Sequence, residues 1–142
     1  MFRVLTMVYM SFFIAACSND IEKSKEDCGE NTVCTQNYVT IGVTIKDNSG
    51  VKIVLDSYKV IDMSTKEDLT LPYSNEEFEN YRNTGYYPIF SDAYRLKYQN
   101  SKVTISFIGY ISENEVITEE FIVGADCCHV SLISGNTEIV LD

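Results

Sequence analysis

The sequence predicts an all-β protein, an antiparallel β-sandwich of about seven short strands with at most one short helix. Over most of residues 37–142, apolar and polar side chains alternate with a period of two, which is typical of strands with one buried face. Turn-forming residues interrupt the alternation at intervals of about 8 to 14 residues, too short for the helical crossovers of a parallel sheet. We therefore expect one domain, residues 37–142, built from antiparallel strands.

The first two strands are expected over residues 39–45 and 51–61. In the first, Val39, Ile41, Val43 and Ile45 are apolar and the residues between them are mostly polar. Residues 47–50 then form a turn, with Gly50 where positive φ is tolerated. Alternation in the second strand breaks near Asp56, which predicts a bulge there. Residues 63–68 predict another turn.

A capping box predicts the one short helix. Ser74 precedes Glu77 by three residues, and Phe78, Tyr81 and Gly85 fit one or two helical turns after it. Further strands are expected over residues 86–90, 94–98, 102–111 and 116–123, and in the last stretch, 129–142.

Residues 1–16 have the layout of a secretory signal peptide. Arg3 supplies a positive charge, and the apolar stretch of residues 4–14 is too short to span a membrane. The small residues Ala15 and Ala16 follow it. We therefore expect the chain to be exported.

Ile14, Ala15, Ala16 and Cys17 resemble the lipobox of bacterial lipoproteins, although Leu is commoner than Ile at the first position. The resemblance implies cleavage before Cys17, a diacylglycerol thioether on its sulfur and a further chain, such as palmitate, on its amine. Two or three such chains, at about 0.8 kcal/mol per buried methylene, hold a protein on a membrane permanently. The alternative, an ordinary cleavage site, would leave Cys17 as an exposed thiol in an oxidising compartment.

Residues 17–36 are expected to be an acidic, solvated tether. Between Ser18 and Asn37 there are five acidic residues and no aromatic residue. Ser18 after the lipid-bearing Cys17 resembles the pattern of lipoproteins sorted to the outer membrane, and the acidic cluster resembles a surface-export signal; a plain hydrophilic spacer is equally open. The expected location is the outer membrane, through a lipid anchor, with the chain facing the periplasm or the cell surface.

The other four cysteines predict two disulfides, since an even number in an exported chain usually pairs. A bridge between adjacent Cys127 and Cys128 would strain the peptide unit, so each is expected to pair with Cys28 or Cys34. We prefer Cys28–Cys127 with Cys34–Cys128, and the sequence leaves this register open. The alternative is a metal site that adds His129, but contiguous ligands on a strand do not converge, and no metal or cofactor is expected.

The segments VTIGVTIKDNSG (39–50) and VKIVLDSYKVIDMST (51–65), with Gly85-Tyr86-Tyr87, resemble the carboxypeptidase regulatory-like or transthyretin-like β-sandwich modules of bacterial surface lipoproteins. The resemblance covers most of residues 38–142, although its turn motifs occur in many sandwiches. Residues 126–142 resemble uncharacterised lipoproteins of the same type, which have no assigned activity. The resemblance thus implies an Ig-like or transthyretin-like fold and no particular function.

Composition and motifs argue against several functions. A formal net charge of −10 speaks against nucleic-acid binding. The single His129 is expected to be structural, because no nucleophile or metalloprotease motif accompanies it. The acidic pairs 76–77 and 119–120 are expected to be solvated surface, and residues 47–50 lack the ligand spacing of a calcium loop. We therefore expect no catalytic residue and no enzyme.

Aromatic residues gather between residues 73 and 98. Tyrosine in loops gives large contact area at low entropy cost, and core packing is the alternative. The candidate binding face, for a protein or glycan partner, comprises Tyr73, Tyr81, Tyr86, Tyr87, Tyr94 and Tyr98. The expected function is a lipid-anchored, non-catalytic binding or accessory module at the cell envelope, with its ligand unidentified. An exported hydrolase with an unrecognised site and a purely structural spacer are the alternatives.

Overall fold

The computed structural model describes residues 28, 29 and 31–142. The expected signal peptide, the expected lipidation site Cys17 and the expected tether as far as residue 27 lie outside the described residues. The elements of the described part are β1 (Thr40–Asp47), β2 (Ser57–Asp62), α1 (Asn75–Thr84), β3 (Tyr86–Ser91), the 3-10 helix η1 (Asp92–Tyr94), β4 (Ser101–Ile111), β5 (Asn114–Ala125), β6 (Val130–Ser134) and β7 (Glu138–Leu141).

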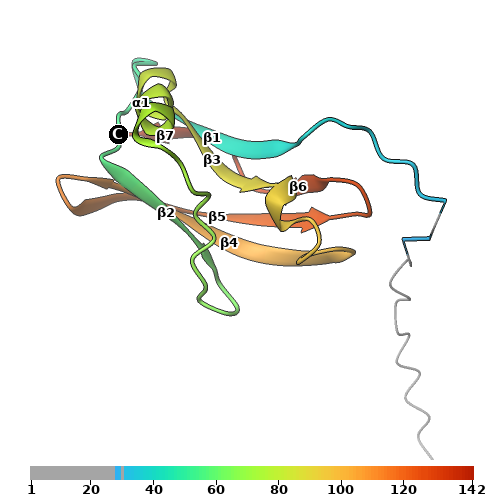
Figure 1. Ribbon diagram of the computed structural model, residues 1–142. Coiled ribbons are helices and arrows are strands. Elements are labelled where there is room, and N and C mark those ends of the chain that lie inside the picture. The colour runs from blue at the N-terminus through green and yellow to red at the C-terminus, as the bar shows by residue number, and fades with distance from the viewer. Residues whose placement is uncertain (1–27, 30) are drawn as a thin grey trace, which may run out of the picture.

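The strands form two sheets that pack face to face, which confirms the predicted all-β sandwich (Figure 1). One sheet has the order β3-β1-β7 and the other β2-β4-β5-β6. The longest hairpin joins β4 to β5 through Ser112 and Glu113, whose φ angles of 48° and 65° are those of a tight hairpin turn. The core between the sheets includes five aromatic side chains that are at most 2% exposed: Tyr58, Tyr87, Phe90, Phe107 and Phe121.

One pair of strands departs from the expected antiparallel arrangement. β1 and β7 run parallel, with Thr44 opposite Glu138 and Asp47 opposite Leu141. The expectation considered only strands that are consecutive in sequence, whereas β7 reaches β1 by crossing from the other sheet after β6. β1 and β7 are the first and last strands of the domain, so the chain between them is long enough for a parallel pairing without a short crossover connection.

The capping box is present, and the helix it begins is longer than one or two turns. The backbone N–H of Ser74 donates to Glu77 Oε2 over 2.7 Å, and the N–H of Glu77 donates to Ser74 Oγ over 3.2 Å. α1 continues for 10 residues and ends at Gly85, which adopts the left-handed conformation with φ 70°.

Two expected strand segments are not strands. Residues 94–98 lie in η1 and the turn after it, where the N–H of Tyr98 donates to Tyr94 O over 3.1 Å. The expected second strand begins only at Ser57, because residues 51–56 bridge back to β1 at Lys52 instead of continuing along the other sheet.

The sandwich has two distinct ends. At the end called here the helix end, α1, the turn 47–50 and the C-terminus lie together, with Asn48 Nδ2 bonded to Asp142 Oδ1 over 2.8 Å. At the opposite, disulfide end, residues 31–38 (the arm) leave β1 beside the connection between β5 and β6 (Figure 1). Among the described residues there is no helix with the length and hydropathy of a membrane span.

Candidate functional site

Two disulfides fasten the N-terminal part of the described chain to the β5–β6 connection. Cys28 pairs with Cys127 and Cys34 with Cys128, with Cα–Cα distances of 5.4 and 5.2 Å, so the preferred pairing is confirmed. With these four sulfurs oxidised, none is a thiolate that could bind a metal. The part of the chain that the structure describes also holds no cluster of three or more His, Cys, Asp or Glu side chains suited to a metal ion.

Asp92 lies at the centre of the disulfide end, at the start of η1. Its carboxylate accepts a hydrogen bond from the N–H of Val39 over 2.9 Å and another from the N–H of Val130 over 2.8 Å. The first of these donors precedes β1 and the second begins β6, so one largely buried side chain joins the two sheets. Burial alone would raise the pKa of Asp92, but the hydrogen bonds from Val39, His129 and Val130 hold it below its usual value.

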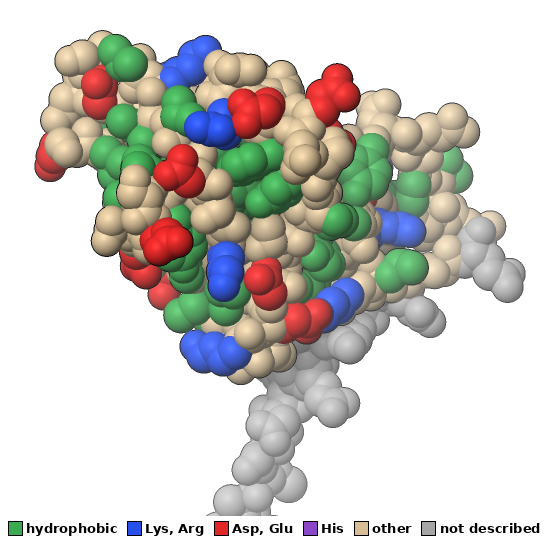
Figure 2. Space-filling view, turned by 60° about the vertical axis from the view of Figure 1, so that its left-hand side comes forward, with side chains coloured by type: hydrophobic (Ala, Val, Ile, Leu, Met, Phe, Trp, Pro, Cys, Tyr) green, Lys and Arg blue, Asp and Glu red, His purple; other side chains and the backbone are tan. Residues whose placement is uncertain are grey.

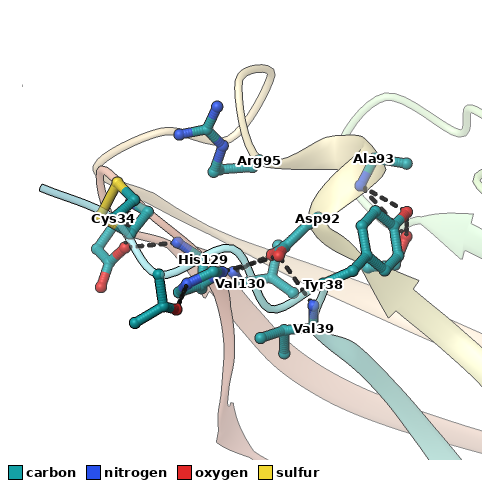
Figure 3. Close-up of polar contacts among 12 residues, drawn as sticks. Cys34, Tyr38, Val39, Asp92, Ala93, Arg95, His129 and Val130 are labelled. Atoms are coloured by element: carbon teal, nitrogen blue, oxygen red, sulfur yellow. Dashed lines mark hydrogen bonds and ion pairs between the residues drawn. A yellow bond between two sulfur atoms is a disulfide. The ribbon is translucent and has the colours of Figure 1, made fainter.

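His129 links Asp92 to the arm (Figure 3). Its Nδ1 lies 2.8 Å from Asp92 Oδ2, and its Nε2 lies 2.8 Å from Thr35 Oγ1. Because the carboxylate can only accept, Nδ1 carries a proton, and Nε2 of the neutral ring accepts from the Thr35 hydroxyl. If the ring is protonated, Nε2 donates instead, so the contact survives in either state.

Two further groups shape the segment Cys127–His129, called here the corner. Asp126 Oδ1 accepts from the N–H groups of Cys128 and His129 over 2.6 and 2.8 Å, and the hydrogen bond from His129 is the main reason why the pKa of Asp126 is lowered. Arg95 Nη1 donates to Cys127 O over 2.5 Å. The side chains thus fix the backbone that holds both cysteines.

An open depression of about 320 Å³ lies beside the corner. Its lining includes Thr35, Tyr38, Asp92, Arg95 and His129. A hydroxyl, an imidazole and a carboxylate hydrogen-bonded in this order are arranged as in the relay that activates a nucleophile. The same hydrogen bonds also fasten the arm to the sandwich, because Thr35 lies in the arm, His129 in the corner and Asp92 in η1.

Of these side chains, the sequence singled out only His129, and Asp92 and Thr35 were missed. The predicted pairing of Cys34 with Cys128 was the available signal. A disulfide brings the neighbours of both cysteines together, and these neighbours are Thr35 and His129.

The candidate tyrosine face is wrong for two of its six members, because they belong to the core. Tyr87 has no exposed surface and Tyr98 only 8%. The Tyr87 hydroxyl accepts from the N–H of Leu55 over 2.9 Å, and the Tyr98 hydroxyl donates to Asp62 over 2.8 Å. Both rings belong to the sandwich core, and only an edge of Tyr98 reaches the surface.

The remaining four members are divided between different places. Tyr73, just before α1, packs edge to face against Tyr81 of α1, and its ring is stacked on that of Tyr58 with the ring centres 5.6 Å apart. Tyr86 is half-exposed and lies over Gly42, whose missing side chain leaves room for the ring. The Tyr94 hydroxyl donates to Leu69 O over 2.9 Å near the other end of β3. The described tyrosines therefore do not form one continuous surface.

A larger depression, of about 580 Å³, lies beside the buried carboxylate of Asp62. That carboxylate accepts from Ser64 Oγ, from Tyr98 and from the N–H groups of Ser64 and Thr65. Burial opposes ionisation, and these hydrogen bonds nevertheless bring the pKa of Asp62 well below its usual range. Its lone pairs are committed to the loop that it organises, so it offers little to a ligand.

No model of a protein family, no curated protein and no solved structure matches the chain. The resemblances to the lipobox and to carboxypeptidase regulatory-like modules therefore remain predictions from the sequence. The fold and the disulfide end stand on the structure alone.

Proposed function

We propose that the chain is an exported, lipid-anchored accessory module of the bacterial outer membrane, held there through Cys17 and acting without catalysis. The observation that carries the proposal is the pair of disulfides, which join residues 99 and 94 positions apart. Such structural bridges persist in oxidising compartments and are rare in the cytosol. Export agrees with the signal-peptide layout of residues 1–16, and the lipid anchor with the lipobox-like residues ending at Cys17.

The polar groups of the described sandwich favour a passive role. The buried carboxylate of Asp62 and the largely buried one of Asp92 have backbone or hydroxyl partners that they need in order to hold loops and strands. An accessory module of this kind would present its surface to a protein or glycan at the envelope.

The proposal is tested by the intact mass of protein extracted from membranes, with and without reduction before alkylation. We expect loss of residues 1–16, the added mass of acyl chains, and four alkylated thiols that appear only after reduction. A Cys17→Ser variant is the matched control and should lack the acyl mass. Unacylated protein in the cytosol, with Cys28, Cys34, Cys127 and Cys128 reduced, would refute the proposal.

A second candidate is an exported hydrolase, favoured by one observation. The Thr35 hydroxyl, His129 and Asp92 have the contacts of a nucleophile, a general base and its orienting carboxylate. In such a reaction Thr35 Oγ would attack an ester carbonyl, His129 Nε2 would take the hydroxyl proton and pass it to the leaving alcohol, and water would release the acyl group. Against it, Thr35 is β-branched and lies in a shallow, open depression.

Hydrolysis of a series of p-nitrophenyl esters separates the two candidates. The accessory role predicts equal rates for the wild type and for Thr35→Ala and Thr35→Ser variants. A hydrolase predicts that Thr35→Ala loses roughly 100-fold or more in rate and that Thr35→Ser retains activity, since a serine hydroxyl keeps the nucleophile.

A further inference from the structure

The most exposed large hydrophobic side chains gather at the disulfide end. Among the described residues, the three highest exposed fractions of such side chains are those of Val33 (93%), Leu96 (72%) and Tyr38 (66%). Single exposed hydrophobic residues are ordinary on protein surfaces, but these three share one end of the sandwich.

Contacts around the corner place these side chains. Val33 precedes Cys34, which is bonded to Cys128. Leu96 follows Arg95, whose guanidinium donates to Cys127 O. Tyr38 lies against η1, where its hydroxyl accepts from the N–H of Ala93 over 3.1 Å (Figure 3). All three residues therefore lie near the place where the arm is attached.

The length of chain before this end limits its distance from a lipid anchor. Cys28 follows Cys17 by 11 residues, and a fully extended chain of that length reaches about 40 Å. Without either bridge, the first residue held by the sheets would be Val39, and the reach would be about 75 Å. The disulfides therefore keep the end that carries Val33, Tyr38 and Leu96 close to whatever surface holds Cys17.

We propose that this end docks on the membrane, with Leu96, Tyr38 and Val33 entering the interface between headgroups and acyl chains. This inference rests on the proposed lipid anchor at Cys17. The basic residues that flank Leu96 already have partners, Arg95 with Cys127 O and Lys97 with Glu67, so the apolar side chains and the short tether carry the proposed contact. Because a short tether holds this end of the sandwich near the membrane, docking behaves as an intramolecular step, and even a weak apolar interaction is enough to populate the docked state. The helix end then points away from the membrane.

The helix end has a different surface. Acidic and basic side chains are interspersed among hydrophobic ones on the face that Figure 2 brings forward. Here Val140, at 58% exposure, is the counterpart of Leu96, on a strand that ends beside the C-terminus. It provides a matched control position.

The sequence has no tryptophan, so one introduced tryptophan reports its own surroundings. Acylated Leu96→Trp and Val140→Trp proteins are each reconstituted into vesicles of phosphatidylethanolamine and phosphatidylglycerol, with and without bromine on the acyl chains. We expect brominated lipid to quench the emission of Leu96→Trp by about twofold or more, because bromine quenches only within the apolar region that an interfacial side chain enters. The emission of Val140→Trp should not change.

Hydroxyl-radical footprinting of the unsubstituted chain on the same vesicles excludes an effect of tryptophan itself. Leu96 should be oxidised more slowly than Val140 although its exposed fraction is larger. Flotation of the vesicles reports the anchor separately. Protein that floats, with Leu96→Trp quenched no more than Val140→Trp, overturns the docking and leaves the anchor standing; protein that does not float overturns both.

Discussion

The two disulfides are interleaved and span almost the same stretch of chain, so we expect the loss of either one to destabilise the domain far less than the loss of both. Cys28–Cys127 and Cys34–Cys128 close nearly the same long loop, with separations of 99 and 94 residues. Either bridge alone restricts the unfolded chain across the whole domain. The second bridge then closes only the short loop made by residues 28–34 and 127–128.

Chain entropy gives the magnitudes. The first bridge, across a loop of about 95 to 100 residues, destabilises the unfolded state by about 4.7 kcal/mol, and the second, across a loop of about 9 residues, adds about 2.5 kcal/mol. The double variants Cys28→Ala/Cys127→Ala and Cys34→Ala/Cys128→Ala should each lose about 2.5 kcal/mol, and the variant without either bridge about 7 kcal/mol. The two single-bridge losses therefore add up to about 2 kcal/mol less than the combined loss.

Equilibrium unfolding in urea, followed by far-ultraviolet circular dichroism, measures these losses at one pH and protein concentration. Alkylation and intact mass before each experiment verify that the remaining bridge is the native one. Additive losses, or a loss above about 4 kcal/mol for one bridge, would show that the bridges act through local strain or packing and would refute the loop-closure reasoning.

Three further predictions concern single side chains. Asp62→Asn should lower the free energy of unfolding by about 1–3 kcal/mol at pH 7, since hydrogen bonds hold the pKa of Asp62 below its usual value. The stabilisation by the ionised carboxylate is complete above about pH 4 and is lost as the pH falls further. The difference between variant and wild type in urea unfolding should therefore shrink towards pH 3. A constant difference between pH 7 and pH 3 would contradict it. Gly124→Ala should lower the thermal midpoint by the equivalent of about 1–3 kcal/mol, because the added Cβ would lie 2.8 Å from Ser101 O. Gly29→Ala is the control and should be neutral, because nothing lies within 4 Å of its added Cβ. Equal midpoints for the two variants would contradict the prediction. Ser74→Ala should lower the free energy of unfolding in urea by about 1 kcal/mol, because α1 loses its N-cap. Ser74→Asp should retain most of the wild-type stability, because Asp is also a good N-cap residue.

The parts of the fold that follow local rules could be predicted from the sequence. The alternation through Val103, Ile105 and Phe107 predicts β4, and Ser74 with Glu77 predicts the start of α1. A covalent constraint also predicted that Cys127 and Cys128 each pair with Cys28 or Cys34, because adjacent cysteines do not readily pair with each other, but it left the register between the two pairs open.

Elements decided by distant contacts could not be predicted in this way. Tyr94 and Tyr98 suit a strand by propensity, yet Ser91 caps η1 and the Tyr94 hydroxyl is bonded to Leu69 O, 25 residues away. The same holds for the site, in which Asp92 meets His129 across 37 residues and Thr35 meets His129 across 94. The alternation of apolar and polar residues does not predict contacts between such distant residues. Only the predicted pairing of Cys34 with Cys128 indicated that Thr35 and His129 lie close together.

The arrangement of the disulfide end also decides where a pull on the tether would enter the fold. Without bridges, force from an anchor at Cys17 would reach the sandwich at Val39 and act first on β1, a strand that begins beside the arm. With Cys28 bonded to Cys127, the force passes instead to the end of β5, which is paired with β4 along its length and with β6 near this end. Three other contacts then carry little of the force, because Cys28–Cys127 takes it up first. They are the Cys34–Cys128 disulfide, the hydrogen bond between Thr35 and His129, and the hydrogen bond between Val39 and Asp92. Reduction of the two disulfides would return the load to β1, so a pull on the N-terminal segment is resisted by β5 only while both bridges are oxidised.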